Sequence, residues 1–385
     1  MAKSAQFKSA ANGCVRRAVD RAIEAGDEIG IQVVAYLDGE EVINQWAGLA
    51  DRDTASEVRP DTLFNVYSVS KAISVTALHL QVERGLIEYD APVVRYWPEY
   101  GTNGKEATTV RDVITHRAGV PQMPEGTTPE EMCDWSLMTK RIAALVPVAP
   151  PGTKALYQAM TYGWLVGEIV RRSDSCRRSF GEFIRDELAG PLDAPDIWIG
   201  VPRQVQRRVA KHVDALPPSR YTGLAAASMP ANLVLVPAVF NRPAIMRAEI
   251  PAVGGVFSAQ SCARFWAMLA QGGELDGVRL LSPQLVATFN QLRRNADEPD
   301  PIMLGNSVPL TVAGFWLGGN NPPVATVKNS RAICHPGVGG VIGWADFDAR
   351  LAVAICHNRM FQPTSRSEDP LLPIADAVRE ALHLG

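Results

Sequence analysis

Ser68 and Lys71, in the stretch Tyr67-Ser68-Val69-Ser70-Lys71, have the residue types and the spacing that acyl transfer requires. On a helix that begins at or just before Ser68, side chains three positions apart lie on one face. Lysine can take the proton of a serine hydroxyl when desolvation or a positive potential keeps its amine neutral. A helix N-terminus supplies that potential and points N–H groups at a developing oxyanion. Taken alone, the motif fits equally well a serine that caps a helix and an exposed lysine.

Three other places could complete a site around Ser68. Tyr157 precedes a predicted helix, and a tyrosine hydroxyl near a lysine can pass a proton between nucleophile and leaving group. His335 begins the run His335-Pro336-Gly337-Val338-Gly339-Gly340, where the backbone can approach a ligand closely and complete an oxyanion hole. His116 lies near a predicted helix C-terminus, whose dipole a histidine stabilises. Packing, a glycine-rich turn and a helix cap are the respective structural alternatives, and for His116 we favour the structural one.

Patterns of several other enzyme classes are missing from the sequence. It contains no Gly-x-Ser-x-Gly elbow, no His-Glu-x-x-His and no glycine loop for nucleotide phosphates. The six histidines and six cysteines are scattered without metal-ligand spacing. We therefore expect no metal, no cofactor and no disulfide framework.

Charge and hydropathy narrow the choice of partners. The formal net charge is −3, and no long run of one sign provides a nucleic-acid footprint. The N-terminal segment is polar and amphipathic, and no stretch reaches the ~18 apolar residues of a membrane span. We expect a cytoplasmic protein that binds a small molecule and neither nucleic acid nor membrane.

Hydrophobic periodicity and turn signals predict the elements that position these residues. Helices are predicted over residues 7–25, 72–84, 110–117, 133–144, 162–172, 179–189, 258–269, from 283 onward, and 369–384. Strands are predicted over residues 29–37, 41–49, 310–317, 325–334, 341–347 and 351–357. Thr109 and Asp112 form a predicted capping box. Residues 190–251, rich in proline and alanine, are predicted to be irregular.

Strands at both chain ends and helices between them predict an α+β fold. We expect both ends to build one antiparallel sheet, flanked by the terminal helices, with a mostly helical domain inserted between them. A chain of 385 residues is long enough for two such parts. The predicted division is 1–66 with 305–385 for the sheet domain and 67–304 for the helical domain.

With these residues in hand, the chain resembles the serine β-lactamase and penicillin-binding-protein superfamily, and within it the class C β-lactamase-like esterases known as family VIII carboxylesterases. The resemblance extends over about residues 12 to 383 and follows the family's order and spacing. The matching segments are Leu63 to Lys71, Ile114 to Pro121, Tyr157 with Thr161 to Gly167, Gly190 to Asp193, Glu249 to Ala252, and His335 to Gly337 with Gly343 to Asp346.

The resemblance implies a role for each matching residue. Ser68 would be the nucleophile, and Lys71 and Tyr157 would share the work of general base and acid. The backbone N–H groups of Ser68 and Val338 would form the oxyanion hole. The implied fold is an α/β sandwich with a helical domain, and the site would lie in the cleft between them.

Two departures from the family pattern bear on the substrate. The β-lactamase members carry Tyr-x-Asn where this chain has Tyr157-Gln158-Ala159, and Lys-Thr-Gly where it has His335-Pro336-Gly337. The first change removes an amide that would hold an acylamino side chain, and the second removes a cation that would face a carboxylate. Histidine is mostly neutral at pH 7. The changes favour esters with uncharged acyl groups over β-lactams.

We therefore predict a serine carboxylesterase for small or short-chain esters that needs no metal or cofactor. An acyltransferase of the same fold, a weak β-lactamase or DD-peptidase, and a non-catalytic binding protein are the alternatives. Ser70 is assigned a supporting role. The predicted substrate-binding residues are Gln158, His335, Gly337, Phe257, Trp316 and Trp344, together with part of the loop 121–130.

Overall fold

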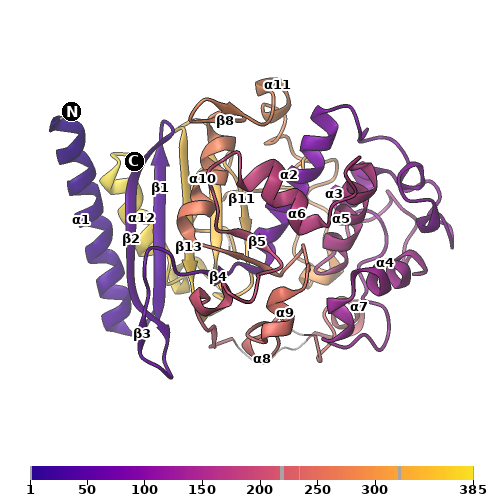
Figure 1. The fold of residues 1–385 in the computed structure, drawn as a ribbon, viewed down its shortest axis with the longest axis horizontal. Coiled ribbons are helices and arrows are strands. Elements are labelled where there is room, and N and C mark those ends of the chain that lie inside the picture. The colour runs from indigo at the N-terminus through magenta and orange to yellow at the C-terminus, as the bar shows by residue number, and fades with distance from the viewer. Residues whose placement is uncertain (1, 217–220, 234, 320–321, 385) are drawn as a thin grey trace.

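A seven-stranded antiparallel sheet dominates the computed structural model, which describes residues 2–216, 221–233, 235–319 and 322–384 (Figure 1). In spatial order its strands are β10 (Trp316–Leu317), β11 (Ile333–Pro336), β12 (Ile342–Asp346), β13 (Leu351–His357), β1 (Gly30–Leu37), β2 (Glu40–Asp51) and β3 (Ser56–Glu57). The chain ends meet where β1 pairs with β13, from Ile31 opposite His357 to Leu37 opposite Leu351. The predicted sheet built from both ends of the chain is confirmed.

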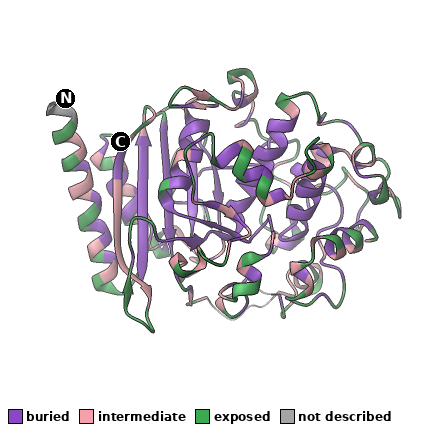
Figure 2. Ribbon diagram, in the orientation of Figure 1, coloured by how far each residue is buried: buried purple, intermediate pink, exposed green. Residues whose placement is uncertain are grey.

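Helices cover both faces of this sheet. The terminal helices α1 (Ala2–Ala25) and α12 (Leu372–Ala381) pack together on one face, and α10 (Ala259–Ala270) packs on the other (Figure 1). Strands covered on both sides read as continuous apolar runs, as β1 and β13 do. Figure 2 shows these central strands buried along their length. No helix among the described residues combines the length and the apolar character needed to cross a bilayer.

The mostly helical part lies beyond α10, on the side away from α1 (Figure 1). Its helices are α2 (Ser70–Glu83), α3 (Val110–Ile114), α4 (Trp135–Ala143), α5 (Thr161–Ser173), α6 (Phe180–Ile184), α7 (Gly223–Ser228), α8 (Pro237–Phe240), α9 (Pro243–Arg247) and α11 (Pro283–Val286). Helix α2 is enclosed on all sides, since every residue from Ser70 to Gln81 is buried. A helix that is buried all round forms the centre of its domain. The predicted capping box is present: the N–H of Asp112 donates to Thr109 Oγ1 at 3.0 Å, and the Thr109 N–H donates to Asp112 Oδ2 at 2.9 Å.

Several segments differ from their predicted structure. The described residues between 190 and 251, which leave out 217–220 and 234, are more ordered than expected, because they hold α7 to α9 and also β5 (Ile197–Ile199). Strand β5 joins β7 (Gly255–Phe257) and β4 (Phe64–Asn65) in a three-stranded sheet. The predicted strand 310–317 is wrong over most of its length. Gly314, at φ +82°, turns the chain back so that Leu310 bridges Trp316. The remaining strands form two short pairs, β6 (Val213–Asp214) with β14 (Arg359–Met360) and β8 (Glu274–Leu275) with β9 (Val278–Arg279).

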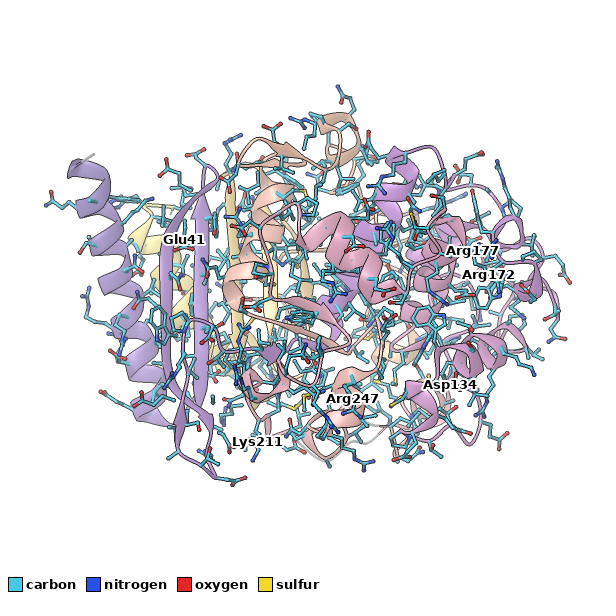
Figure 3. The ribbon with its side chains drawn as sticks, in the orientation of Figure 1. Glu41, Asp134, Arg172, Arg177, Lys211 and Arg247 are labelled. Atoms are coloured by element: carbon cyan, nitrogen blue, oxygen red, sulfur yellow. The ribbon has the colours of Figure 1, made fainter. Side chains whose placement is uncertain are left out.

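Polar contacts join the sheet to the helical part at one end. The buried side-chain amide of Asn358 contacts the carbonyl oxygens of Leu49 and Lys211 at 3.0 and 3.1 Å. The Lys211 ammonium, labelled in Figure 3, also pairs with Asp51 at 2.9 Å. Lys211 is half exposed, and an exposed ion pair contributes only about 0–1 kcal/mol. The buried amide is the more important of these two contacts.

Helix α10 belongs with the sheet in space, although it lies within the span 67–304 that the sequence assigns to the helical domain. The close approach requires a glycine in β12. A Cβ on Gly343 would overlap the indole Nε1 of Trp266, which projects from α10. Gly343 therefore sets the distance between helix and sheet, while the exact domain boundaries stay a prediction.

Replacing Gly343 by alanine should destabilise the protein, because the buried indole of Trp266 has no room to move aside. Overpacking of this kind costs about 1–3 kcal/mol in the free energy of unfolding. Urea unfolding monitored by tryptophan fluorescence measures it. Gly319→Ala is the matched control, since a Cβ there meets no atom within 4 Å. Equal stability of the two variants would contradict the role given to Gly343.

Candidate active site

Ser68 lies in a 3-10 turn, Tyr67–Val69, that runs directly into α2. The turn is strained, since Tyr67 has φ +46°, a conformation that a non-glycine residue adopts at a cost of about 1–3 kcal/mol. The Tyr67 N–H donates to Asn65 Oδ1 at 2.9 Å. The Tyr67 ring is completely buried, with its hydroxyl 3.3 Å from the sulfur of Met360. These contacts hold the turn that presents the serine.

Ser70 stabilises the same turn through its side-chain hydroxyl. Its hydroxyl donates to the carbonyl oxygen of Tyr67 and accepts the N–H of Gly255 at 2.9 Å. A Cβ on Gly255 would come within 2.5 Å of Ser70 Oγ, so strand β7 must carry a glycine here. Ser70 thus connects the turn to the three-stranded sheet and is not placed as a nucleophile.

Lys71 has no exposed surface, and its Nζ lies 2.9 Å from Ser68 Oγ. The same nitrogen donates to the carbonyl oxygens of Ala159 at 2.8 Å and Ala252 at 3.0 Å. Burial lowers the pKa of Lys71 well below its ordinary value. A neutral amine has two N–H bonds and one lone pair. The two carbonyls take both N–H bonds, so the lone pair of neutral Lys71 faces the Ser68 hydroxyl.

Tyr157 reaches the serine from the segment that precedes α5. Burial raises the pKa of its hydroxyl above the ordinary value, although the nearby Ser68 side chain acts to lower it. Lys71 Nζ lies 5.3 Å from the centre of the Tyr157 ring. Ser68 and Tyr157 keep 6% and 7% of their surface exposed, whereas Lys71 keeps none. The site is therefore open to solvent on the side of the serine and the tyrosine.

Asp300 fixes the backbone of Tyr157, and the sequence analysis missed it. The Tyr157 N–H donates to Asp300 Oδ2 at 2.7 Å, and the Ile302 N–H donates to Asp300 Oδ1 at 2.8 Å. An aspartate directly before Pro301 is a helix-cap signal that the sequence does show. Nothing local in the sequence indicates that its second oxygen reaches Tyr157.

His116 supports the same segment. Its ring lies 4.5 Å from the Tyr157 ring, centre to centre, and its Nδ1 accepts the Gln158 N–H at 3.0 Å. Burial, helped by the nearby positive groups, lowers the pKa of His116 well below 6.5. A neutral imidazole whose Nδ1 accepts a hydrogen bond carries its proton on Nε2. His116 thus has a structural role, as a platform and acceptor for residues 157–158 in addition to following a helix end.

The sheet contributes the second half of the expected oxyanion hole. Gly337 follows β11, and a Cβ there would come within 2.5 Å of the carbonyl oxygen of Val66, just before the nucleophile turn. The next residue is Val338. Among the described residues, no acceptor takes the N–H of Ser68 or that of Val338. Two free N–H groups on neighbouring segments are the arrangement that an oxyanion hole requires.

His335 occupies the place where the family pattern has a lysine, and it carries no charge at neutral pH. Burial lowers the pKa of His335 to about 3. Its Nδ1 lies 2.9 Å from the carbonyl oxygen of Pro336 and must donate to it, which leaves Nε2 as an acceptor. No cation therefore faces the site from this position.

The expected pocket residues lie at different distances from Tyr157. Trp316 lies edge-on to Tyr157, with ring centres 5.9 Å apart. Gln158 is fully buried next to Tyr157. Phe257 is completely buried within the three-stranded sheet, opposite Phe64. Its expected place in the pocket wall is not supported.

Trp344 is buried in β12, and its place in the pocket stays a prediction. In the pairing of β11 with β12, His335 is opposite Gly343 and Cys334 is opposite Trp344. Neighbouring residues of a strand point to opposite faces. The face of Gly343 is the one that α10 covers, because a Cβ on Gly343 would meet Trp266 of that helix.

The loop 121–130 lines a pocket of its own. Its residues 122–127 enclose about 420 Å³ together with Leu145, Ala226, Ala227, Pro230 and Asn232. None of the three catalytic candidates belongs to this wall. Within the described part of the chain, no three histidine, cysteine, aspartate or glutamate side chains form a group that could hold a metal ion.

Known proteins resemble this chain along most of its length. The Beta-lactamase family model matches residues 15–376. The chain is 35% identical to the Esterase/beta-lactamase LipL of Mycobacterium tuberculosis over 350 residues, which cover 87% of this chain and 78% of that protein. Among solved structures, a family VIII carboxylesterase superposes with a TM-score of 0.86 at 28% identity, covering 96% of this chain and 97% of the other. A penicillin-binding protein homologue from Caulobacter crescentus gives 0.85 at 29% identity, with the same coverage of both chains.

A neutral Lys71 makes the stability of the protein depend on pH. The folded state lowers this pKa, so between the folded value and about 10.4 only the unfolded state holds the extra proton. Stability should therefore rise with pH, by up to about 1.4 kcal/mol per pH unit for this group. In urea unfolding at pH 7, 8 and 9, wild type should gain stability relative to Lys71→Met.

The control for this measurement is Lys154→Met, which removes an exposed lysine. It should follow the wild-type dependence on pH. A constant difference between wild type and Lys71→Met across the three pH values would mean that Lys71 is charged in the folded protein.

Proposed function

The chain belongs to the Beta-lactamase family, and from this premise we propose that it is a serine esterase that cleaves small carboxylic esters through an acyl-Ser68 intermediate. The observation that carries the proposal is the contact of 2.9 Å between Lys71 Nζ and Ser68 Oγ, with the amine buried and its other two directions taken by carbonyl groups. A base held in this way is already deprotonated and oriented before the substrate arrives.

In the acylation step, Lys71 takes the proton of Ser68 as Oγ attacks the ester carbonyl carbon. The negative charge that develops on the carbonyl oxygen is stabilised by the N–H groups of Ser68 and Val338. The bond between the acyl carbon and the alcohol oxygen then breaks. The departing oxygen receives a proton from Tyr157, and Lys71 returns a proton to Tyr157.

This assignment gives Lys71 the role of first base and Tyr157 that of acid. Burial lowers the pKa of the lysine and raises that of the tyrosine, so at pH 7 the amine is ready to accept a proton and the phenol still has one to donate. In the second step, water gives a proton to the same relay and attacks the acyl carbon. The products are the free acid and Ser68 with its proton restored.

The two replaced positions support an ester substrate rather than a β-lactam. Ala159 contributes only its carbonyl, to Lys71, and offers no side-chain amide to a substrate. His335 is neutral and offers no charge to a carboxylate. The related LipL of Mycobacterium tuberculosis is named an esterase and β-lactamase, and the superposed structure is called a carboxylesterase. We propose that esters with small, uncharged acyl groups are the main substrates.

Ser68→Ala should lower kcat/KM for p-nitrophenyl butyrate by about a thousandfold or more, because the acyl-enzyme cannot form. Wild type mixed with a slowly deacylating ester should gain the mass of one acyl group in intact-protein mass spectrometry, and the variant should gain none. Ser70→Ala is a useful second variant, since it removes a hydroxyl from the same turn and should still form the adduct.

Two results would overturn the proposal. Full esterase activity in Ser68→Ala would rule out Ser68 as the nucleophile. Turnover of the β-lactam nitrocefin by wild type as fast as ester turnover would show that the replaced residues do not set the preference for esters.

Tyr157→Phe tests the acid role, because the need for a proton depends on the leaving group. An alkoxide leaves only with a proton, whereas p-nitrophenolate leaves without one. We expect kcat/KM to fall about 10²- to 10⁴-fold for ethyl butyrate and much less for p-nitrophenyl butyrate. Tyr100→Phe, which alters another buried tyrosine, is the matched control. An equal fall for both esters would mean that Tyr157 acts on Ser68 and not on the leaving group.

A further inference from the structure

The chain that leaves the end of β13 contacts both halves of the proposed oxyanion hole. This segment, residues 357–361, starts at the last residue of β13 and includes β14. Three of its side chains, those of His357, Met360 and Phe361, are buried, with at most 7% of their surface exposed. None of the three takes part in the acyl transfer itself. We call residues 357–361 the oxyanion support.

One half of the hole, the N–H of Val338, belongs to a turn that has little stiffness of its own. Gly339 and Gly340 follow it with φ of +90° and +110°, and glycine has more backbone freedom than any other residue. The support restrains this turn from outside. The Phe361 N–H donates to the carbonyl oxygen of Gly339 at 3.1 Å. A Cβ on Gly340 would lie 2.5 Å from Phe361 Cζ and 3.0 Å from His357 Nε2, so both rings touch its backbone.

Met360 joins the support to the other half of the hole, the N–H of Ser68. Its sulfur lies 3.3 Å from the hydroxyl of Tyr67, the residue before the nucleophile. A Cβ on Gly339, the residue after Val338, would lie 3.0 Å from Met360 Cγ. One side chain therefore lies between the two segments that carry the donors. Both donors must come within about 2.7–3.1 Å of one oxygen, so their spacing matters for the reaction.

A buried pair of side chains fixes the His357 ring. Its Nδ1 lies 3.2 Å from Glu28 Oε1, and the two side chains keep 1% and 0% of their surface exposed. Within the described part of the chain, the Glu28 carboxylate makes no hydrogen bond to any other group. A buried carboxylate is costly without a partner, so this contact determines where the ring lies. The Phe361 ring stacks on His357 with ring centres 5.1 Å apart.

We propose that His357 and Phe361 are positioning residues of the oxyanion hole, and that their stacked rings, anchored by Glu28, fix the Gly339–Gly340 turn and with it the direction of the Val338 N–H. The inference rests on the proposed esterase function and deepens it. The two rings touch neither the substrate nor the reacting atoms. Their loss should weaken the stabilisation of the developing negative charge and leave nucleophile, base and acid in place.

The test changes the substrate atom that the hole binds. The esters p-nitrophenyl butyrate and O-p-nitrophenyl thionobutyrate differ only in having C=O or C=S at the carbon that Ser68 attacks. Sulfur is larger than oxygen and a weaker hydrogen-bond acceptor, so the thionoester gains little from N–H groups spaced for an oxygen. The measured quantity is the ratio of kcat/KM for the oxygen ester to kcat/KM for the thionoester. Intrinsic reactivity cancels when this ratio is compared between variants.

In Phe361→Leu the ratio should fall about tenfold or more. Removing one donor from such a hole costs about 10²- to 10³-fold in rate, and a displaced donor loses part of that. Phe289→Leu is the matched control, because it removes another buried ring, one that packs on His79 and Phe315. Its ratio should stay within about twofold of wild type. A change that only lowers the amount of folded protein reduces both rates equally and leaves the ratio unchanged.

Two variants of Glu28 test the same support without changing either ring, and they apply also if Phe361→Leu does not fold. Glu28→Gln keeps an oxygen facing His357 Nδ1 and should keep the wild-type ratio. Glu28→Leu leaves His357 without its partner and should lower the ratio about tenfold, as the displaced turn moves one donor. An equal fall in the two variants would overturn the part assigned to Glu28.

The remaining outcomes separate the inference from the proposed function. An unchanged ratio in Phe361→Leu, or an equal fall in Phe289→Leu, overturns the inference while Ser68 stays the nucleophile. Equal hydrolysis of both esters by wild type also overturns it, since no hole would then distinguish oxygen from sulfur. Absence of Ser68-dependent hydrolysis of either ester overturns the proposed function instead.

Discussion

The burial of one amine, that of Lys71, is the constraint on which the rest of the site depends. An ammonium ion cannot be enclosed cheaply without a counter-charge, so the fold supplies two carbonyl oxygens and keeps the amine neutral. Those carbonyls, of Ala159 and Ala252, are 88 and 181 residues away in the sequence. The nucleophile turn, the start of α5 and the approach to β7 must therefore meet at one point.

The architecture explains how segments so far apart meet with such accuracy. Pairing of β1 with β13 closes the sheet from both chain ends and places β11 beside the nucleophile turn. The three-stranded sheet holds the turn from the other side through Ser70 and Gly255. The strained Tyr67 persists because Asn65, its enclosed ring and Ser70 all restrain it. The strain is stored where the serine is presented, and the cost is offset by packing elsewhere.

The sequence predicts the sheet and the catalytic core better than it predicts the pocket. Ser68, Lys71 and Tyr157 follow from motif and order, and the structure brings these side chains together. Phe257 and Trp344 could not be placed, because a shift of one residue in register moves a side chain to the other face of a sheet. Asp300 contacts the Tyr157 backbone across 143 residues of sequence, and no periodic pattern marks such a contact. The predicted strands 310–317 and 325–334 are longer than the observed ones. An apolar run does not reveal where a glycine or a turn reverses the direction of the chain.

Two buried histidines of the site, His116 and His335, are uncharged at neutral pH, because burial lowers the pKa of both. Where a buried lysine is the base, a permanent cation nearby lowers its pKa further and keeps it neutral, whereas an unpaired anion would do the opposite. The neutral His335 therefore adds no charge to the site.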